Sequence, residues 1–328
     1  MADRIIRLNN LKERKFAMSK LKRIVDSNIS LIMIFAGVIG YAAVCGWFFY
    51  EEIFNKTNAF DWFGNKKEFF NKNPGYLLWM ASVVIQPVIW FIILIPATTI
   101  IRRLTNELRP EKHIWVSFFT IVLMFVIFNR ITFYTFDQYF TRPGSLLINH
   151  IEKLKNFTII GQVVGLYYLF GAVLVSKVSM KMVEEKRYDF LCYKRLKSYL
   201  EAVINFTAVI FTLGIISAML FRKTINDDSL YPSEFLISLG ILNSLLILIL
   251  YLPAHFTLFY YGRKILENKF GSVLSEKESE MDVVLKQIEL SKNLSLSLGI
   301  PQSIKTSLVI LSPVISSFIP DLMKIFQK

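Results

Sequence analysis

The hydrophobic pattern of the chain is dominated by apolar runs about as long as a bilayer is thick. Six such runs occupy residues 29–50, 76–101, 114–136, 157–176, 202–221 and 235–262. A helix of about 20 apolar residues covers the hydrocarbon layer, which is ~30 Å thick. The run 114–136 is apolar or weakly polar except for Asn129 and Arg130. The pattern predicts an all-α, polytopic membrane protein with about six transmembrane helices.

Basic residues alternate between the connections, and this alternation predicts the topology. Lys and Arg number 8, 4, 7 and 4 in segments 1–28, 102–113, 177–199 and 263–277. They number only 4, 3 and 2 in segments 51–75, 135–156 and 222–234. Cytoplasmic loops carry the excess of Lys and Arg, so six spans with both termini in the cytoplasm are expected. The net charge of +13 is thereby assigned to topology and to anionic lipid of the bilayer.

The pattern divides the chain into three parts. Residues 1–28 form a predicted basic amphipathic cytoplasmic helix, residues 29–262 the six-span transmembrane domain, and residues 263–328 a cytoplasmic helical tail for self-association in a homo-oligomer. Within the tail, the apolar stretch 307–320 contains Pro313 and is short for a span. A re-entrant segment, an interfacial helix and a contact between subunits all remain open for this stretch, and we favour the last two.

Catalytic patterns are missing from the sequence. It contains no Walker A loop, no nucleotide-binding glycine fingerprint and no HExxH pair. Carboxylates are nearly absent from the predicted spans, which removes the parts for acid–base work or a proton relay. His113, His150 and His255 fall at different depths and cannot share a metal ion. We therefore expect no enzyme activity, no cofactor and no metal site.

Polar side chains inside the predicted spans are the candidates for a pore or gate. They are Gln86, Asn129, Arg130, Gln162, Asn205, Asn243 and His255. Arg130 is expected near the outer interface, where it either snorkels to water or contributes to a positive ring at the mouth of a pore. Gln162 lies within Gly161-x-x-x-Gly165, a close-packing pattern, so it either bonds a neighbouring helix or faces a pore.

A second group of candidates lies in the predicted loop 177–199, which mixes seven basic residues with aromatic ones. Such a mixture holds a nucleotide or a single-stranded oligonucleotide by charge and stacking, and it is equally common in loops at the membrane surface. Arg102 and Arg103 face the same compartment in the predicted topology. The ligand-binding candidates are Arg102, Arg103, Lys186, Arg187, Tyr193, Lys194 and Arg195.

The basic N-terminus, the spans without enzyme motifs, the basic-aromatic loop and the tail LSLGIPQSIKTSLVILSPVISSFIP together resemble membrane effectors of bacterial anti-phage systems. The chain is most similar to the ion-channel effector of the Hailong-type system. That resemblance implies a homo-oligomeric channel controlled by a nucleic-acid-like messenger from a cognate nucleotidyltransferase, which stops an infected cell by depolarising its membrane. It transfers no individual site residue.

Three functions remain open from the sequence. The first is an oligomeric ion channel of a bacterial cytoplasmic (inner) membrane, gated from the cytosol by a nucleotide or oligonucleotide. The second is a secondary transporter, indicated by Pro87 and Pro96 in the second run and Pro253 in the sixth, each of which is expected to break a helix. The third is a structural membrane protein that conducts nothing.

Overall fold

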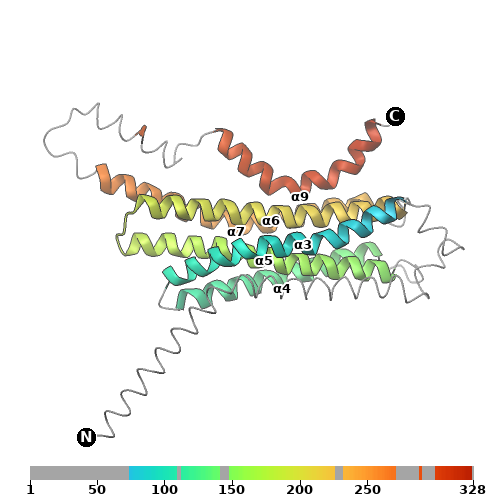
Figure 1. Ribbon diagram of the computed structural model, residues 1–328, viewed down its shortest axis with the longest axis horizontal. Helices are drawn as coiled ribbons and strands as arrows, with labels where there is room; N and C mark the ends of the chain where they lie inside the picture. Colours follow the sequence, from blue (N-terminus) through green and yellow to red (C-terminus); the bar gives the residue numbers. More distant parts are fainter. Residues whose placement is uncertain are drawn as a thin grey trace, which may run out of the picture. The chain divides into compact units, whose positions relative to one another are not determined.

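The computed structural model describes residues 74–108, 112–140, 148–225, 232–270, 288–289 and 300–326. Across these residues the chain is helical and forms no strand (Figure 1). The predicted helix 1–28 and the predicted span 29–50 lie outside the described ranges. The principal helices are α3 (Pro74–Glu107), α4 (Lys112–Phe140), α5 (Ile148–Glu184), α6 (Phe190–Ile225), α7 (Ser233–Phe270) and α9 (Ile300–Phe326).

Five of these helices, α3 to α7, are long and apolar enough to cross a membrane. They contain the predicted runs 76–101, 114–136, 157–176, 202–221 and 235–262, which confirms those five runs as helices. Each helix extends beyond its run at one end or both, because the flanking charged residues also favour helix. The total number of spans and their direction across a bilayer stay predictions.

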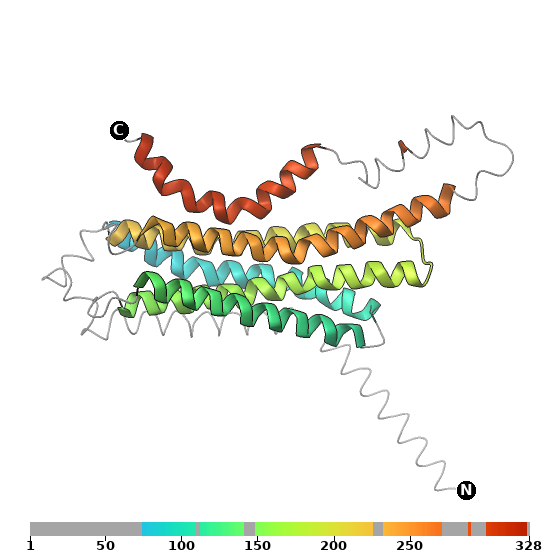
Figure 2. The ribbon, with the colours of Figure 1, turned by 180° about the vertical axis from the view of Figure 1, so that it is seen from behind.

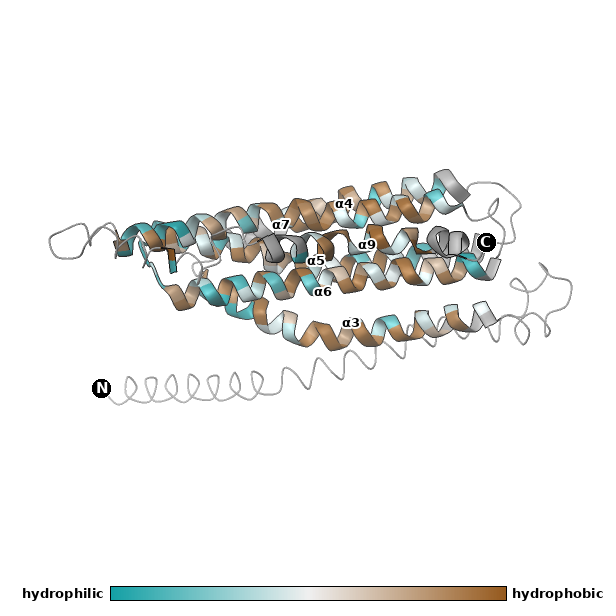
Figure 3. Cartoon of the chain, turned by 90° about the horizontal axis from the view of Figure 1, so that it is seen from above, coloured by the Kyte–Doolittle hydropathy of each residue, from teal (hydrophilic) through white to brown (hydrophobic). Residues whose placement is uncertain are grey.

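The helices bury polar groups and expose large apolar ones, which is the reverse of a water-soluble bundle. Gln86, Gln162 and Asn243 are at most 5% exposed, whereas Ile92, Phe119 and Phe256 are more than 60% exposed. Figure 3 shows the apolar colouring continuing along the middle of the helices, with hydrophilic residues concentrated toward the ends. Large apolar patches open to the surroundings mark surfaces for lipid or for partner subunits.

Helix α5 occupies the centre of the bundle and packs against α3, α4, α6 and α7. Small residues permit the close approach. A Cβ atom built on Gly165 would lie 2.4 Å from Cε1 of Phe211 on α6, and one on Gly171 would lie 2.8 Å from Cγ2 of Val203. The predicted packing role of the pattern around Gly165 is thus confirmed, and larger residues there would force α5 and α6 apart.

Two predictions about chain breaks are wrong. The prolines expected to break helices lie within continuous helices, Pro87 and Pro96 in α3 and Pro253 in α7. Neighbouring turns hold the helix together around each missing donor. The predicted loop 177–199 is also mostly helix, since α5 continues to Glu184 and α6 begins at Phe190.

Helix α9 covers part of one side of the bundle (Figures 1 and 2). It packs against α6 and α7 through small and hydroxyl residues. The hydroxyl groups of Ser312 and Thr212 lie 3.0 Å apart, and a Cβ atom on Gly240 would lie 2.9 Å from the carbonyl oxygen of Pro313. The helix is bent, with its middle nearest the bundle, and Pro313 accounts for a bend there. The stretch 307–320, predicted to be interfacial or intersubunit, therefore contacts its own chain.

The outward face of α9 is apolar. Leu308, Leu311, Ile315 and Phe318 are all more than 40% exposed, while Ser316 and Ser317 on the other side are buried. This orientation matches that of α3 to α7, with large apolar groups outward and small polar groups inward. The cytoplasmic location predicted for the tail 263–328 stays a prediction.

Candidate functional site

The site lies at the end of the bundle where α3 and α5 finish and α6 begins. We call this the basic end, because Arg103, Lys181 and Arg195 gather there. The α5–α6 connection spans only residues 185–189. Lys186 adopts a left-handed conformation, with φ of 53°. The Arg187 N–H donates to the Met182 carbonyl at 2.9 Å, and the Lys186 N–H donates to the Val183 carbonyl at 3.1 Å. These bonds close α5 as a Schellman motif.

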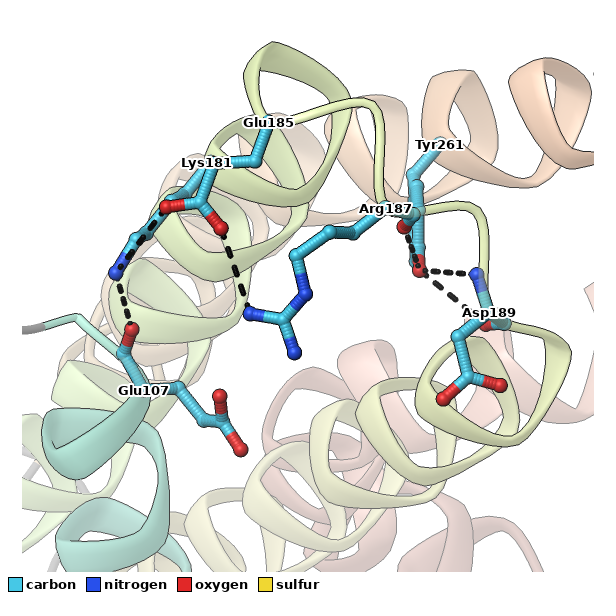
Figure 4. Close-up of polar contacts among 6 residues, drawn as sticks. All are labelled: Glu107, Lys181, Glu185, Arg187, Asp189 and Tyr261. Carbon is cyan, nitrogen blue, oxygen red and sulfur yellow. Dashed lines mark hydrogen bonds and ion pairs between the residues drawn. The ribbon is translucent and has the colours of Figure 1, made fainter.

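Asp189 starts the next helix. Its carboxylate accepts a hydrogen bond from the Leu191 N–H at 2.9 Å, as expected of an N-cap residue. The buried Tyr261 of α7 holds the connection in place from the other side (Figure 4). Its hydroxyl donates to the Arg187 carbonyl at 3.0 Å and accepts from the Asp189 N–H at 3.2 Å. One side chain of α7 thus fixes where α5 ends and α6 begins.

Lys181 joins the ends of α3 and α5. Its Nζ donates to the Glu107 carbonyl at 2.6 Å, and it lies 3.7 Å from the Glu185 carboxylate (Figure 4). Arg187 lies 3.4 Å from that same carboxylate. A cation at the end of α3 satisfies a carbonyl that has no partner within the helix and opposes the negative end of the helix dipole. The charged side chains at this part of the basic end therefore hold the ends of α3 and α5 together.

A cleft of about 500 Å³ opens beside these contacts, between α3, α5 and α6. Arg103 and Arg195 supply two positive charges to its lining, and Glu107 supplies one negative charge. The Arg103 guanidinium donates to the Tyr199 hydroxyl at 3.0 Å, so the arginine is held at the edge of the ring. The lining residues are Arg103, Leu104, Asn106, Glu107, Val178, Cys192, Arg195, Leu196 and Tyr199.

The lining favours an anionic ligand with a flat apolar part. Two guanidinium groups suit phosphate oxygens, and Tyr199 offers a ring on which a base stacks. Within the described residues, no group of three or more His, Cys, Asp or Glu side chains is placed to hold a metal ion. Cys192 is a half-buried free thiol in the wall of the cleft. Among the residues that line the cleft, no nucleophile is paired with a base.

The structure divides the predicted ligand-binding residues. Arg103 and Arg195 line the cleft, whereas Lys186, Arg187 and Lys194 are exposed outside its lining, and Arg102 is half-buried on α3. Tyr193 is a correction: it is 3% exposed and packs against Tyr261, with 6.2 Å between ring centroids. Its ring is therefore unavailable for stacking on a ligand.

Sequence reasoning missed Asn106, Glu107 and Cys192 as parts of the cleft. Once α6 is known to begin at Phe190, residues 192, 195, 196 and 199 share one helical face, with spacings of three, one and three. A loop assignment hides that periodicity. The helical pattern within 190–199 would have identified Cys192, whereas Asn106 and Glu107 belong to α3, whose approach to α6 no local pattern shows.

The seven predicted pore and gate residues differ in their exposure. Gln86, Gln162 and Asn243 are buried, Asn129 and His255 are half-buried, and Arg130 and Asn205 are exposed. The Gln162 amide donates to the Thr132 hydroxyl of α4 at 2.7 Å, so the predicted bond to a neighbouring helix is confirmed. The Nδ1 atom of His255 lies 3.1 Å from the Tyr251 hydroxyl on the same helix.

Comparison with known proteins adds no family to this picture. No protein-family model, no curated protein and no solved structure matches the chain.

Proposed function

We propose that the protein is an oligomeric ion channel of a bacterial cytoplasmic membrane, gated from the cytosol by a nucleotide or single-stranded oligonucleotide. In this proposal the basic end faces the cytosol, and the protein is an effector of the Hailong-type defence class that depolarises an infected cell. A nucleotidyltransferase supplies the ligand. Membrane insertion is supported by five long apolar helices that expose large apolar side chains and bury amide groups.

The observation that carries the proposal is the basic, aromatic cleft at the end of the bundle. Its lining comes from α3, α5 and α6, so one occupant touches three helices that are each long and apolar enough to cross a membrane. A ligand shifts a conformational equilibrium only through contacts that differ between two states. A ligand between helix ends makes such contacts whenever the helices tilt against one another.

The experiment is planar-bilayer recording from the purified full-length protein. Short single-stranded oligonucleotides and mononucleotides are added separately to each side. We expect current that changes with ligand on one side only, and we expect Arg195→Ala to abolish the ligand effect while leaving ligand-independent current intact. A bilayer that stays electrically silent with and without ligand would overturn the channel proposal.

Lys194 provides the matched control. It is adjacent to Arg195, carries the same charge and lies with its Nζ 4.5 Å from the Phe190 ring centroid, outside the cleft lining. Lys194→Ala is therefore expected to respond to ligand as the native protein does. Glu107→Gln removes the one negative charge of the lining and is expected to tighten binding of an anionic ligand. Equal loss in the Lys194 and Arg195 variants would show diffuse attraction to the surface instead of a site.

A secondary transporter is the second candidate, because buried Gln162 and Asn243 place polar groups inside one subunit. That function predicts saturable flux of a substrate into proteoliposomes and no single-channel current. Flux and current measurements on the same preparation separate the two candidates.

A further inference from the structure

Three side-chain amides inside the bundle each lack a hydrogen-bond partner for their carbonyl oxygen. They are Asn129 on α4, Gln162 on α5 and Asn243 on α7, and we call them the amide layer. Gln162 and Asn243 are 2% and 5% exposed. The NH₂ group of Gln162 is used by Thr132, which leaves its oxygen as the unpartnered atom. Buried amide oxygens in proteins are nearly always paired, so three on mutually packed helices require an explanation.

Helix register places Gln162 and Asn243 at one depth. Helices α5 and α7 both run toward the basic end, and the hydroxyl groups of Ser176 and Thr257 join them at 3.1 Å. Gln162 and Asn243 each lie fourteen residues before that contact. Fourteen residues are about 21 Å and close to four full turns, so both amides return to the facing sides of the two helices.

The third amide reaches a similar depth through α4. The rings of Phe136 and Phe235 are in contact, with 4.8 Å between centroids, and fix α4 against α7. Toward the basic end, Asn129 lies seven residues from Phe136 and Asn243 lies eight residues from Phe235. These separations are about 10.5 Å and 12 Å along antiparallel helices, so the two amides differ in depth by about 1.5 Å. The bond from Gln162 to Thr132 sets Gln162 beside α4 three residues, or about 4.5 Å, from Asn129. The three amides therefore lie within about one helical turn of one another in depth at the α4–α5–α7 junction.

We infer that the amide layer is a binding site for a monovalent alkali cation within a single subunit. Backbone carbonyl oxygens coordinate Na⁺ or K⁺ in membrane proteins, and the side-chain amides of Asn and Gln offer the same kind of neutral oxygen donor. The layer contains no carboxylate, and a divalent cation normally requires carboxylate ligands. A single positive charge is thus the largest charge that this set of donors suits.

The site goes beyond the proposed gating cleft, which lies at the end of the bundle and takes anions. It also differs from a pore between subunits, because all three donors come from one chain. Cation binding is measured without current or ligand, so the inference stands or falls separately from the channel proposal.

The test is cation-specific stabilisation of the purified full-length protein. The apparent Tm is measured in NaCl, KCl and N-methyl-D-glucamine chloride at equal ionic strength, and binding of radiolabelled Na⁺ and Rb⁺ is measured at equilibrium. We expect one alkali cation to raise Tm saturably above the value in N-methyl-D-glucamine and to bind saturably. Asn243→Leu is expected to abolish both effects.

Gln86→Met is the matched control, since Gln86 is a buried glutamine on α3, outside the α4–α5–α7 junction. It should keep the cation effect in full. Asn243→Asp, which adds a negative charge to the layer, should bind the cation more tightly, and this gain does not depend on the folding of the leucine variant. An identical Tm in all three salts together with no saturable binding would overturn the inference and leave the layer as a site for water only.

Discussion

The basic end and the amide layer use polar groups in opposite ways. At the basic end, Lys181, Asp189 and Tyr261 each satisfy a backbone group of a neighbouring helix or turn. In the amide layer, the carbonyl oxygens of Gln162 and Asn243 are buried without a partner. A satisfied network holds one geometry, whereas an unsatisfied one costs stability unless something from outside completes it. The contrast separates polar residues that build the fold from those left for a ligand.

The largest effect is expected for Tyr261→Phe, which tests whether hydrogen bonds at the basic end stabilise the fold. The change removes the hydroxyl that joins the Arg187 carbonyl to the Asp189 N–H. We expect a loss of about 2 kcal/mol in unfolding free energy, because buried backbone groups lose their partner. Thermal unfolding in detergent measures it. Tyr260→Phe, at the exposed neighbouring position, should change little, and equal losses in both variants would contradict the assignment.

A smaller loss is expected for Asp189→Ala, which removes the N-cap of α6. Substitution of such a cap typically costs about 1 kcal/mol. Asn at this position keeps a side-chain oxygen that accepts the same hydrogen bond, so Asp189→Asn should stay close to the native stability. If Asn were as damaging as Ala, the carboxylate charge and not the cap would be the stabilising feature.

The amide layer should respond in the other direction. In the absence of alkali cations, Asn243→Leu is expected to leave stability unchanged or raise it by less than about 1 kcal/mol, since it removes an orphan acceptor at nearly constant volume. Thr132→Val, which breaks the bond made to Gln162 in the same layer, should be destabilising. If Asn243→Leu lowered the unfolding free energy in cation-free buffer, the Asn243 amide would be stabilising the fold as the basic end does, which would contradict this prediction.

The smallest effect is expected for Lys186→Gly. Lys186 holds a φ of 53° at the end of α5, where glycine is preferred because it lacks a Cβ atom. The substitution should stabilise the basic end by about 0.5 kcal/mol. Hydrogen exchange of the α5–α6 connection measures the local change, and faster exchange in the variant would show that the lysine side chain itself supports the turn.

Much of the fold was predictable because a helix that crosses lipid needs a long uninterrupted run of apolar residues. The five described spans are found where residues such as Ile92 and Phe119 form uninterrupted apolar runs. Helix ends were not predictable in the same way. Charged residues between Lys177 and Tyr199 mark a membrane boundary, but they are also good helix formers, so α5 and α6 continue through them and shorten the loop to five residues.

The candidate site was predictable only in part, for a related reason. Composition identified Arg103 and Arg195 as cations on the same side of the membrane, and the structure brings both to one cleft. Composition could not show that Tyr193 points inward while Tyr199 lines the cleft, because that depends on the rotation of α6 about its axis. The similar depth of Asn129, Gln162 and Asn243 depends on register between helices distant in sequence, which no local pattern records.

The direction of α9 has a consequence for the two faces of the membrane. Ser312 of α9 contacts Thr212 in the middle of α6, and Ser317 contacts Gly240, which lies only seven residues from the start of α7. Because α7 starts at the end of the bundle opposite the basic end, α9 runs away from the basic end, in the same direction as α6. If α9 crosses the bilayer beside α6, its end lies in the compartment opposite the α5–α6 connection, whereas the predicted cytoplasmic tail leaves both in one compartment. The apolar part of α9, Lys305–Ile319, is shorter than the five candidate spans. Alkaline phosphatase, which is active only outside the cytoplasm, separates the two arrangements when it is fused behind α9 and, in a second protein, inserted between α5 and α6. Activity in the α9 fusion alone would contradict the predicted cytoplasmic tail.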